Sequence, residues 1–187
     1  MLKTEYEEWK ELLLKQPKEK LVDMILLNML KDHYFVRQVE DEIVVKNLSV
    51  QEMIKEYLDR VMEEMQMDIP NVDYLESISE NLLETAETLQ SLCEQVEICT
   101  TIIMTLDDAI NHGAGFENED DFLLFDVIEE GSTFLMKILK EKCETLAKEE
   151  YIQLYDMLEK ASKVPLSAGD IMKEAFDIMK TQEKYAS

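Results

Sequence analysis

The sequence predicts an all-α protein, and three observations support this fold class. The chain has 187 residues but only 4 Gly and 3 Pro, too few for the many turns of an all-β or α/β fold. Leu, Met, Glu and Lys are abundant, and these residues favour helices. Apolar residues also recur at helical spacing along most of the chain. We therefore expect an antiparallel helical bundle or a short helical-hairpin array of seven to nine helices.

Length and apolar content predict a single all-α domain over residues 1–187. Apolar residues make up 46% of the chain, and a chain of this size buries roughly 70% of its surface on folding. A sub-division into N-terminal helices (1–68) and a long-helix bundle (69–187) is the alternative.

Helix starts are marked in the N-terminal part of the chain. Pro17 suits the first turn of a helix that extends to about Lys31. That helix is apolar around most of its circumference, so we expect it at the centre of the fold. Ser49 followed by Glu52 predicts a capping box at the start of a further helix.

The segment 73–112 contains no Pro or Gly and has a regular apolar pattern. Apolar residues recur every seven positions, at Leu75, Leu82, Leu89, Val96, Ile103 and Ile110. This repeat predicts one long helix that ends at Gly113. A break near 89–91, which would give a hairpin of two helices, is the alternative.

The remaining segments predict three more helices after an acidic, Gly-containing loop at 113–121. One runs from Asp120 or Asp121 to about Cys143 with Gly131 inside it, where a kink is an option. The next spans about 147–162, and the last begins near Ser167.

The negative charge is concentrated in the middle of the chain. The formal net charge is −23, and the segment 61–136 holds 19 of the 42 acidic residues and no Lys or Arg. On the predicted long helix, acids share one heptad position at Glu80, Glu87, Glu94 and Asp108. Neighbours in this ridge are roughly 10.5 Å apart along the helix, too far to chelate one metal ion. The ridge predicts either a solvated face or a docking surface for a basic partner.

Two carboxylate pairs indicate that the protein could instead be an enzyme, which is the alternative to a docking role. Glu94-Gln-Val-Glu97 followed by Glu117-Asn-Glu-Asp120 is similar to the E-x-x-E…E-x-x-D arrangement of all-α nucleoside triphosphate pyrophosphohydrolases. The resemblance implies Mg²⁺ held by Glu94, Glu97, Glu117 and Asp120. The sequence departs from that family in two ways: the second pair lies in a predicted loop, and no Lys or Arg is near to hold a triphosphate.

Other functional classes lack support in the sequence. The three cysteines, Cys93, Cys99 and Cys143, form no C-x-x-C motif, so we expect free thiols in a reducing compartment, the cytoplasm. The sequence contains no run of 18 uncharged apolar residues, so we expect no membrane span. It also contains no cluster of Lys and Arg of the kind that binds nucleic acid. We expect no metal and no cofactor.

The N-terminal segment Trp9-Lys-Glu-Leu-Leu-Leu-Lys-Gln-Pro-Lys-Glu-Lys-Leu-Val-Asp-Met-Ile-Leu-Leu-Asn-Met-Leu-Lys-Asp resembles the helical region that follows the SWIM-type zinc finger in bacterial proteins. The segment Thr105–Asp121, a helix followed by Gly and an acidic loop, is similar to a later part of that region. The zinc finger itself is absent. The resemblance implies a HEAT-like array of helical hairpins and no assigned activity.

Together these observations predict a non-catalytic helical scaffold for a protein partner with a basic or amphipathic helical surface. The alternative is the Mg²⁺-dependent nucleotide pyrophosphohydrolase. Self-association through an exposed part of the long apolar seam is a further option.

Overall fold

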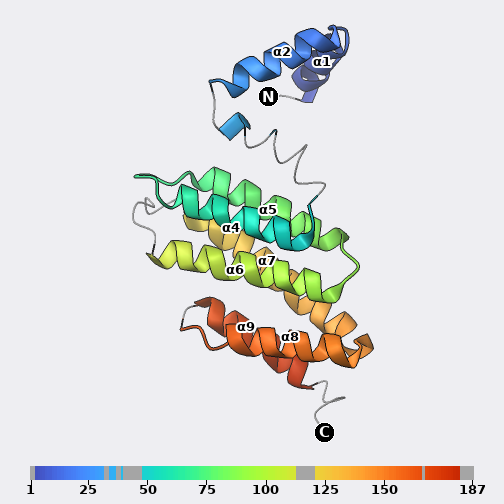
Figure 1. Cartoon of the computed structure of the whole chain (residues 1–187), viewed down its shortest axis with the longest axis vertical. Helices are drawn as coiled ribbons and strands as arrows, with labels where there is room; N and C mark the ends of the chain where they lie inside the picture. The colour runs from blue at the N-terminus through green and yellow to red at the C-terminus, as the bar shows by residue number, and fades with distance from the viewer. Residues whose placement is uncertain are drawn as a thin grey trace. The chain divides into compact units, whose positions relative to one another are not determined.

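The computed structural model of the chain confirms the all-α prediction (Figure 1). It describes residues 3–31, 34–36, 39, 48–112, 121–165 and 167–181. Within these residues there is no strand. The helices are α1 Lys3–Leu14, α2 Lys18–Met29, α4 Val50–Glu64, α5 Val72–Thr88, α6 Leu92–His112, α7 Asp121–Lys142, α8 Lys148–Ala161 and α9 Ser167–Thr181, with a 3-10 turn η2 at Cys143–Thr145.

The chain divides into two compact units, residues 1–48 and 49–187. The predicted central position of the apolar helix beginning after Pro17 is wrong, because α2 has no buried residue. Its apolar side chains have no layer of helices to cover them within the described part of the first unit. Helix α4 belongs to the second unit, although the alternative sub-division grouped it with the N-terminal helices.

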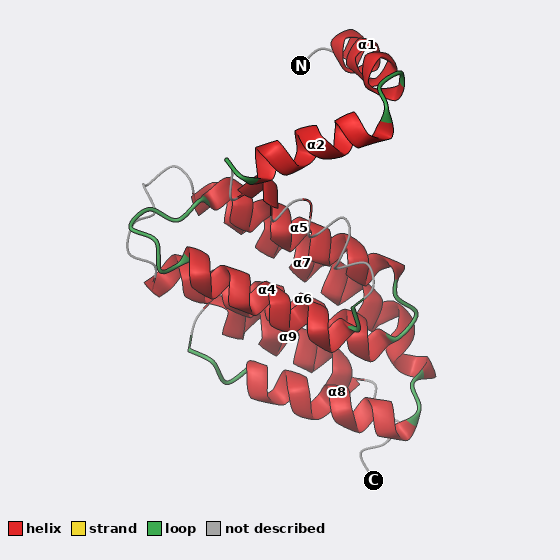
Figure 2. Ribbon diagram, turned by 45° about the horizontal axis from the view of Figure 1, so that its top comes forward, coloured by secondary structure: helices red, strands yellow, loops and turns green. Residues whose placement is uncertain are grey.

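The second unit is a two-layer array of antiparallel helices. Helices α4, α6 and α8 form one layer, in which α6 contacts both α4 and α8. Helices α5, α7 and α9 form the other layer, in which α7 contacts both α5 and α9. Successive helices run in opposite directions, and the two layers lie face to face (Figures 1 and 2). This is the arrangement of a helical-hairpin array.

Helix α6 is the central element of this unit, because it packs against α4, α5, α7, α8 and α9. Its inward side chains are completely buried, at Val96, Ile98, Cys99, Ile102, Ile103 and Leu106. Since burial of a large aliphatic side chain stabilises by about 1.5–3 kcal/mol, this row supplies much of the driving force for folding.

The long helix predicted over 73–112 is wrong, and the alternative break near 89–91 is what the structure shows. Helix α5 ends at Thr88, Leu89 has an extended backbone, and α6 begins at Leu92. The side-chain oxygen of Ser91 accepts from the N–H of Glu94 at 3.4 Å, so it helps to cap α6. The seven-residue repeat continues across the break because both helices bury their apolar faces in the same core.

A buried glutamine stabilises the turn between α5 and α6 through hydrogen bonds to two other helices. Gln95 is 1% exposed, and its Nε2 donates to the carbonyl of Ala86 at 3.0 Å, near the end of α5. Its Oε1 accepts from Nζ of Lys142, at the end of α7, at 2.8 Å. One side chain therefore connects three helices, which no local sequence pattern reveals.

The predicted capping box at the start of α4 is confirmed. The Glu52 carboxylate accepts from the Ser49 N–H at 2.8 Å, and the Ser49 hydroxyl accepts from the Glu52 N–H at 3.4 Å. These bonds satisfy two backbone donors that the first turn of a helix otherwise leaves free.

Candidate functional site: an acidic face on α5 and α7

Helix α5 carries a row of carboxylates along one side. Asp73, Glu76, Glu80, Glu84 and Glu87 are spaced three or four residues apart, and such positions share one face of a helix. Four of them are exposed, while Glu76 is half-buried. The opposite side of α5 is buried in the core. We call these five residues the acidic stripe.

Helix α7 adds negative charge beside the stripe. It packs against α5, and Asp126 is close enough to act electrostatically on Glu76. Partial burial raises the pKa of the Glu76 carboxyl, and the negative charges of Glu80, Asp73 and Asp126 raise it further. Carboxylates from two helices therefore crowd one surface.

No basic side chain of α5 relieves this crowding, and none of α7 does before Lys137, because the sequence has no Lys or Arg between 61 and 136. Like charges at this spacing repel, and the repulsion is screened only by solvent and salt. These two helix segments therefore contribute negative charge to the surface without a base of their own to offset it.

The first two turns of α7 also expose aromatic rings. Phe122 is 68% exposed and Phe125 is 45% exposed. Positions 122, 125, 126 and 129 fall on one helical face, so the two rings share it with the exposed carboxylates of Asp126 and Glu129. We call the stripe together with these four residues the acidic face.

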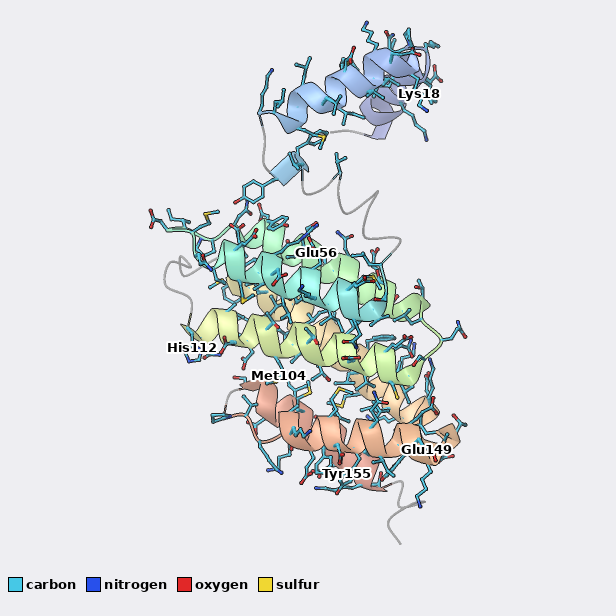
Figure 3. All side chains as sticks on the ribbon, in the orientation of Figure 1. Lys18, Glu56, Met104, His112, Glu149 and Tyr155 are labelled. Atoms are coloured by element: carbon cyan, nitrogen blue, oxygen red, sulfur yellow. The ribbon has the colours of Figure 1, made fainter. Side chains whose placement is uncertain are left out.

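The ridge predicted from the heptad positions is only half correct. Glu80 and Glu87 lie on the stripe. Glu94 lies in the first turn of α6 and Asp108 near its other end, and α6 belongs to the other layer. Asp108 pairs with His112, labelled at the end of α6 in Figure 3, at 3.0 Å.

The predicted heptad ridge left out three members of the stripe and the contribution of α7. Asp73, Glu76 and Glu84 follow the spacing of three and four residues, not of seven. That spacing was visible in the sequence, but the assumption of one coiled-coil-like helix selected the heptad instead. The neighbourhood of Asp126 depends on tertiary packing, which the sequence does not display.

The alternative catalytic set is only partly placed. Glu94 and Glu97 lie one turn apart on α6, and Nε2 of Gln51 on α4 lies 2.8 and 2.7 Å from the two carboxylate oxygens of Glu97. Glu117 and Asp120 are outside the described residues. Among the residues that the structure does describe, no group of three or more His, Cys, Asp or Glu could hold a metal ion. The pyrophosphohydrolase alternative stays untested.

The three cysteines are free thiols, as predicted. Burial raises the pKa of Cys99 to about 12 and that of Cys143 to about 11. Burial and nearby carboxylates also raise the pKa of Cys93. Because the thiolate is the nucleophile, none of them is activated for catalysis.

Two open grooves are lined by residues outside the acidic face. One, of about 640 Å³, lies between α6 and α8 and includes Asp156 and Lys160 in its lining. The other, of about 550 Å³, lies between α7 and α9 and includes Lys137, Lys140 and Glu174. Each mixes acids and bases on a shallow surface, so neither concentrates one kind of chemistry as the acidic face does.

No known protein family, curated protein or solved structure matches the chain. The resemblance to the region after the SWIM-type zinc finger therefore stays a prediction. Of the helices described, none has the length and apolar character needed to cross a membrane.

Proposed function

We propose that the protein is a non-catalytic helical scaffold that binds a protein partner through the acidic face. The main support for the proposal is that carboxylates of α5 and α7 come together, at Glu76 and Asp126, in a segment of the chain that has no Lys or Arg between 61 and 136. A partner with a basic or amphipathic helical surface would relieve the repulsion between these groups. Nucleic acid and anionic membranes would increase it.

The rigid support of the face favours docking. The side of α5 opposite the stripe is anchored by the buried side chains of Leu75, Ile78 and Leu82. Tyr57 on α4 also bonds through its hydroxyl to Ser79 of α5 at 3.0 Å. Charges held on an anchored helix lose little conformational freedom when a partner binds.

The competing interpretation is a solvated face that only keeps the protein soluble. The two differ in whether the position of the charges matters. Docking depends on the charges of the stripe in particular, whereas solubility depends on the total charge.

A labelled helical peptide of Lys and Leu tests the proposal by fluorescence anisotropy at low salt. The variant Glu80→Gln/Glu84→Gln removes two charges from the stripe. Its matched control, Glu149→Gln/Asp156→Asn, removes two exposed charges from α8, where Figure 3 labels Glu149. We expect the stripe variant to bind about tenfold more weakly, equal to about 1.4 kcal/mol, and the control to bind like the wild type. Equal losses in both variants, or none in either, would refute docking at this face.

A further inference from the structure

The aromatic pair on α7 is not part of the hydrophobic core. The apolar residues around it on the same helix are buried, including Leu124, Val127 and Ile128. Phe122 and Phe125, by contrast, are 68% and 45% exposed. Two large rings one turn apart on a surface are a feature of interaction sites, since exposed aromatic side chains often serve as interface anchors.

The composition of the surrounding surface restricts what can cover these rings. Asp126 is one turn after Phe122, and Glu129 is one turn after Phe125. A purely apolar partner would bury these carboxylates without a counter-charge, which is costly. A purely hydrophilic cationic partner would leave the rings exposed to water. The surface therefore fits a partner that offers apolar and cationic side chains at alternating positions.

We propose that Phe122 and Phe125 are the apolar anchors of a docking site for a cationic amphipathic helix. Its leucine-like side chains cover the two rings, and its Lys or Arg side chains pair with Asp126, Glu129 and the stripe. This inference rests on the proposed function and specifies the partner for the same face. We expect the partner to be a helix because the acidic stripe on α5, and the rings and carboxylates on α7, are each spaced three to four residues apart. A helical partner presents its own side chains at the same spacing.

The chain itself contains an example of the contact that a lysine of the partner would make. Nζ of Lys180 lies 4.1 Å from the ring centroid of Phe176, in the last two turns of α9. A cation at this distance is attracted by the face of the ring. Phe122 and Phe125 are exposed, so an ammonium or guanidinium group of the partner would make such a contact with their rings.

Charge argues against other occupants of this face. A second copy would bring a chain of net charge −23 against it. An anionic lipid surface would meet the same repulsion. A cationic helix is attracted at long range and gains apolar burial at contact.

Two peptides of equal charge test the proposal with the full-length protein. One is a Lys/Leu helix, and in the other every Leu is replaced by Ser. The variant Phe122→Ala/Phe125→Ala removes the rings from exposed helical positions, where Ala favours the helix. Ile152→Ala on α8, which is 47% exposed, is the apolar control. Thermal unfolding verifies that each variant is folded.

We expect the phenylalanine variant to bind the Lys/Leu peptide at least about tenfold more weakly and the Lys/Ser peptide unchanged, and Ile152→Ala to have no effect. Unchanged binding of the Lys/Leu peptide would overturn the anchor proposal. If Glu80→Gln/Glu84→Gln still weakens binding in that case, the proposed function stands and only the anchor fails. Sedimentation that shows a wild-type dimer, lost in the phenylalanine variant, would assign the rings to self-association instead and would also overturn the proposal.

Discussion

The carboxylate of Asp107 on α6 caps the first turn of α9, 61 residues later in the chain. Its Oδ2 accepts from the backbone N–H of Ala168 at 3.0 Å, and the side chain of Asn111 donates to its Oδ1 at 3.2 Å. Asp107 is 2% exposed. A buried carboxylate at a helix N-terminus is stabilised by free N–H groups and by the helix dipole. This bond connects the central helix to the last helix of the array.

Replacing Asp107 should therefore destabilise the protein much more than replacing its neighbour. We expect Asp107→Ala to lower the free energy of unfolding by about 2–3 kcal/mol, since a hydrogen bond to a charged group is lost and a buried N–H is left without a partner. Asp108→Ala, at an exposed position, should change it by less than about 0.5 kcal/mol. Urea unfolding measures both values, and a similar loss in the two variants would contradict the capping role.

Two glycines inside helices should respond in opposite ways to substitution by alanine. A Cβ atom at Gly169 would lie 1.9 Å from the carbonyl oxygen of Val164, whereas at Gly131 the nearest atom is Cγ1 of Ile103 at 3.5 Å. Gly169→Ala should cost about 1–3 kcal/mol through overpacking. Gly131→Ala should stabilise by about 0.5–1 kcal/mol through helix propensity. Thermal unfolding of the two variants tests both signs, and destabilisation by Gly131→Ala would disprove the ordinary contact with Ile103.

Neutralising Glu76 should stabilise the fold near pH 7. The pKa of this carboxyl is raised in the folded protein, so folding favours its protonated form. The group therefore does not destabilise the fold below its unfolded pKa of about 4.5. The fold loses stability as the pH rises through the folded pKa, because the carboxylate then forms at a site that disfavours it. Glu76→Gln should raise Tm at pH 7 and leave it unchanged at pH 3.5, where the carboxyl of the wild type is protonated. Glu149→Gln is the control. The prediction fails if Glu76→Gln lowers Tm at pH 7.

Salt should stabilise the wild-type protein. Because the segment 61–136 has a formal charge of −19, its self-repulsion is screened as the Debye length falls from about 30 Å at 0.01 M to about 8 Å at 0.15 M. We expect Tm at pH 7 to rise between 0.01 and 0.15 M NaCl. A flat or falling Tm in differential scanning calorimetry would mean that basic residues elsewhere already compensate the acidic face.

Local chemistry made much of the fold predictable. The Ser49–Glu52 capping box, the helices after Ala147 and Ser167 and the free thiols all depend on residues close in sequence or on composition. Helix α7 continues through Gly131 because the helix-forming residues on both sides outweigh one glycine. The position of Pro17 at the start of α2 was equally visible.

The α5–α6 turn and the composition of the acidic face were harder to predict. Ser91 and Glu94 do form the S-x-x-E signature of a helix start, but the uninterrupted apolar repeat favoured a single helix. The contacts that fix the turn, from Gln95 to Ala86 and Lys142, join segments up to 47 residues apart. The effect of Asp126 on Glu76 likewise arises only when α7 packs beside α5.

Amide chemical-shift mapping locates the surface on which a cationic helix docks. The isotope-labelled full-length protein is titrated with the unlabelled Lys/Leu peptide at low salt, and perturbed amides are assigned to helices. If the peptide docks on the acidic face, the largest shifts fall in α5 between 73 and 87 and in α7 between 122 and 129. Shifts concentrated in α8 and α9, or spread evenly over the whole surface, would contradict a docking site on the acidic face.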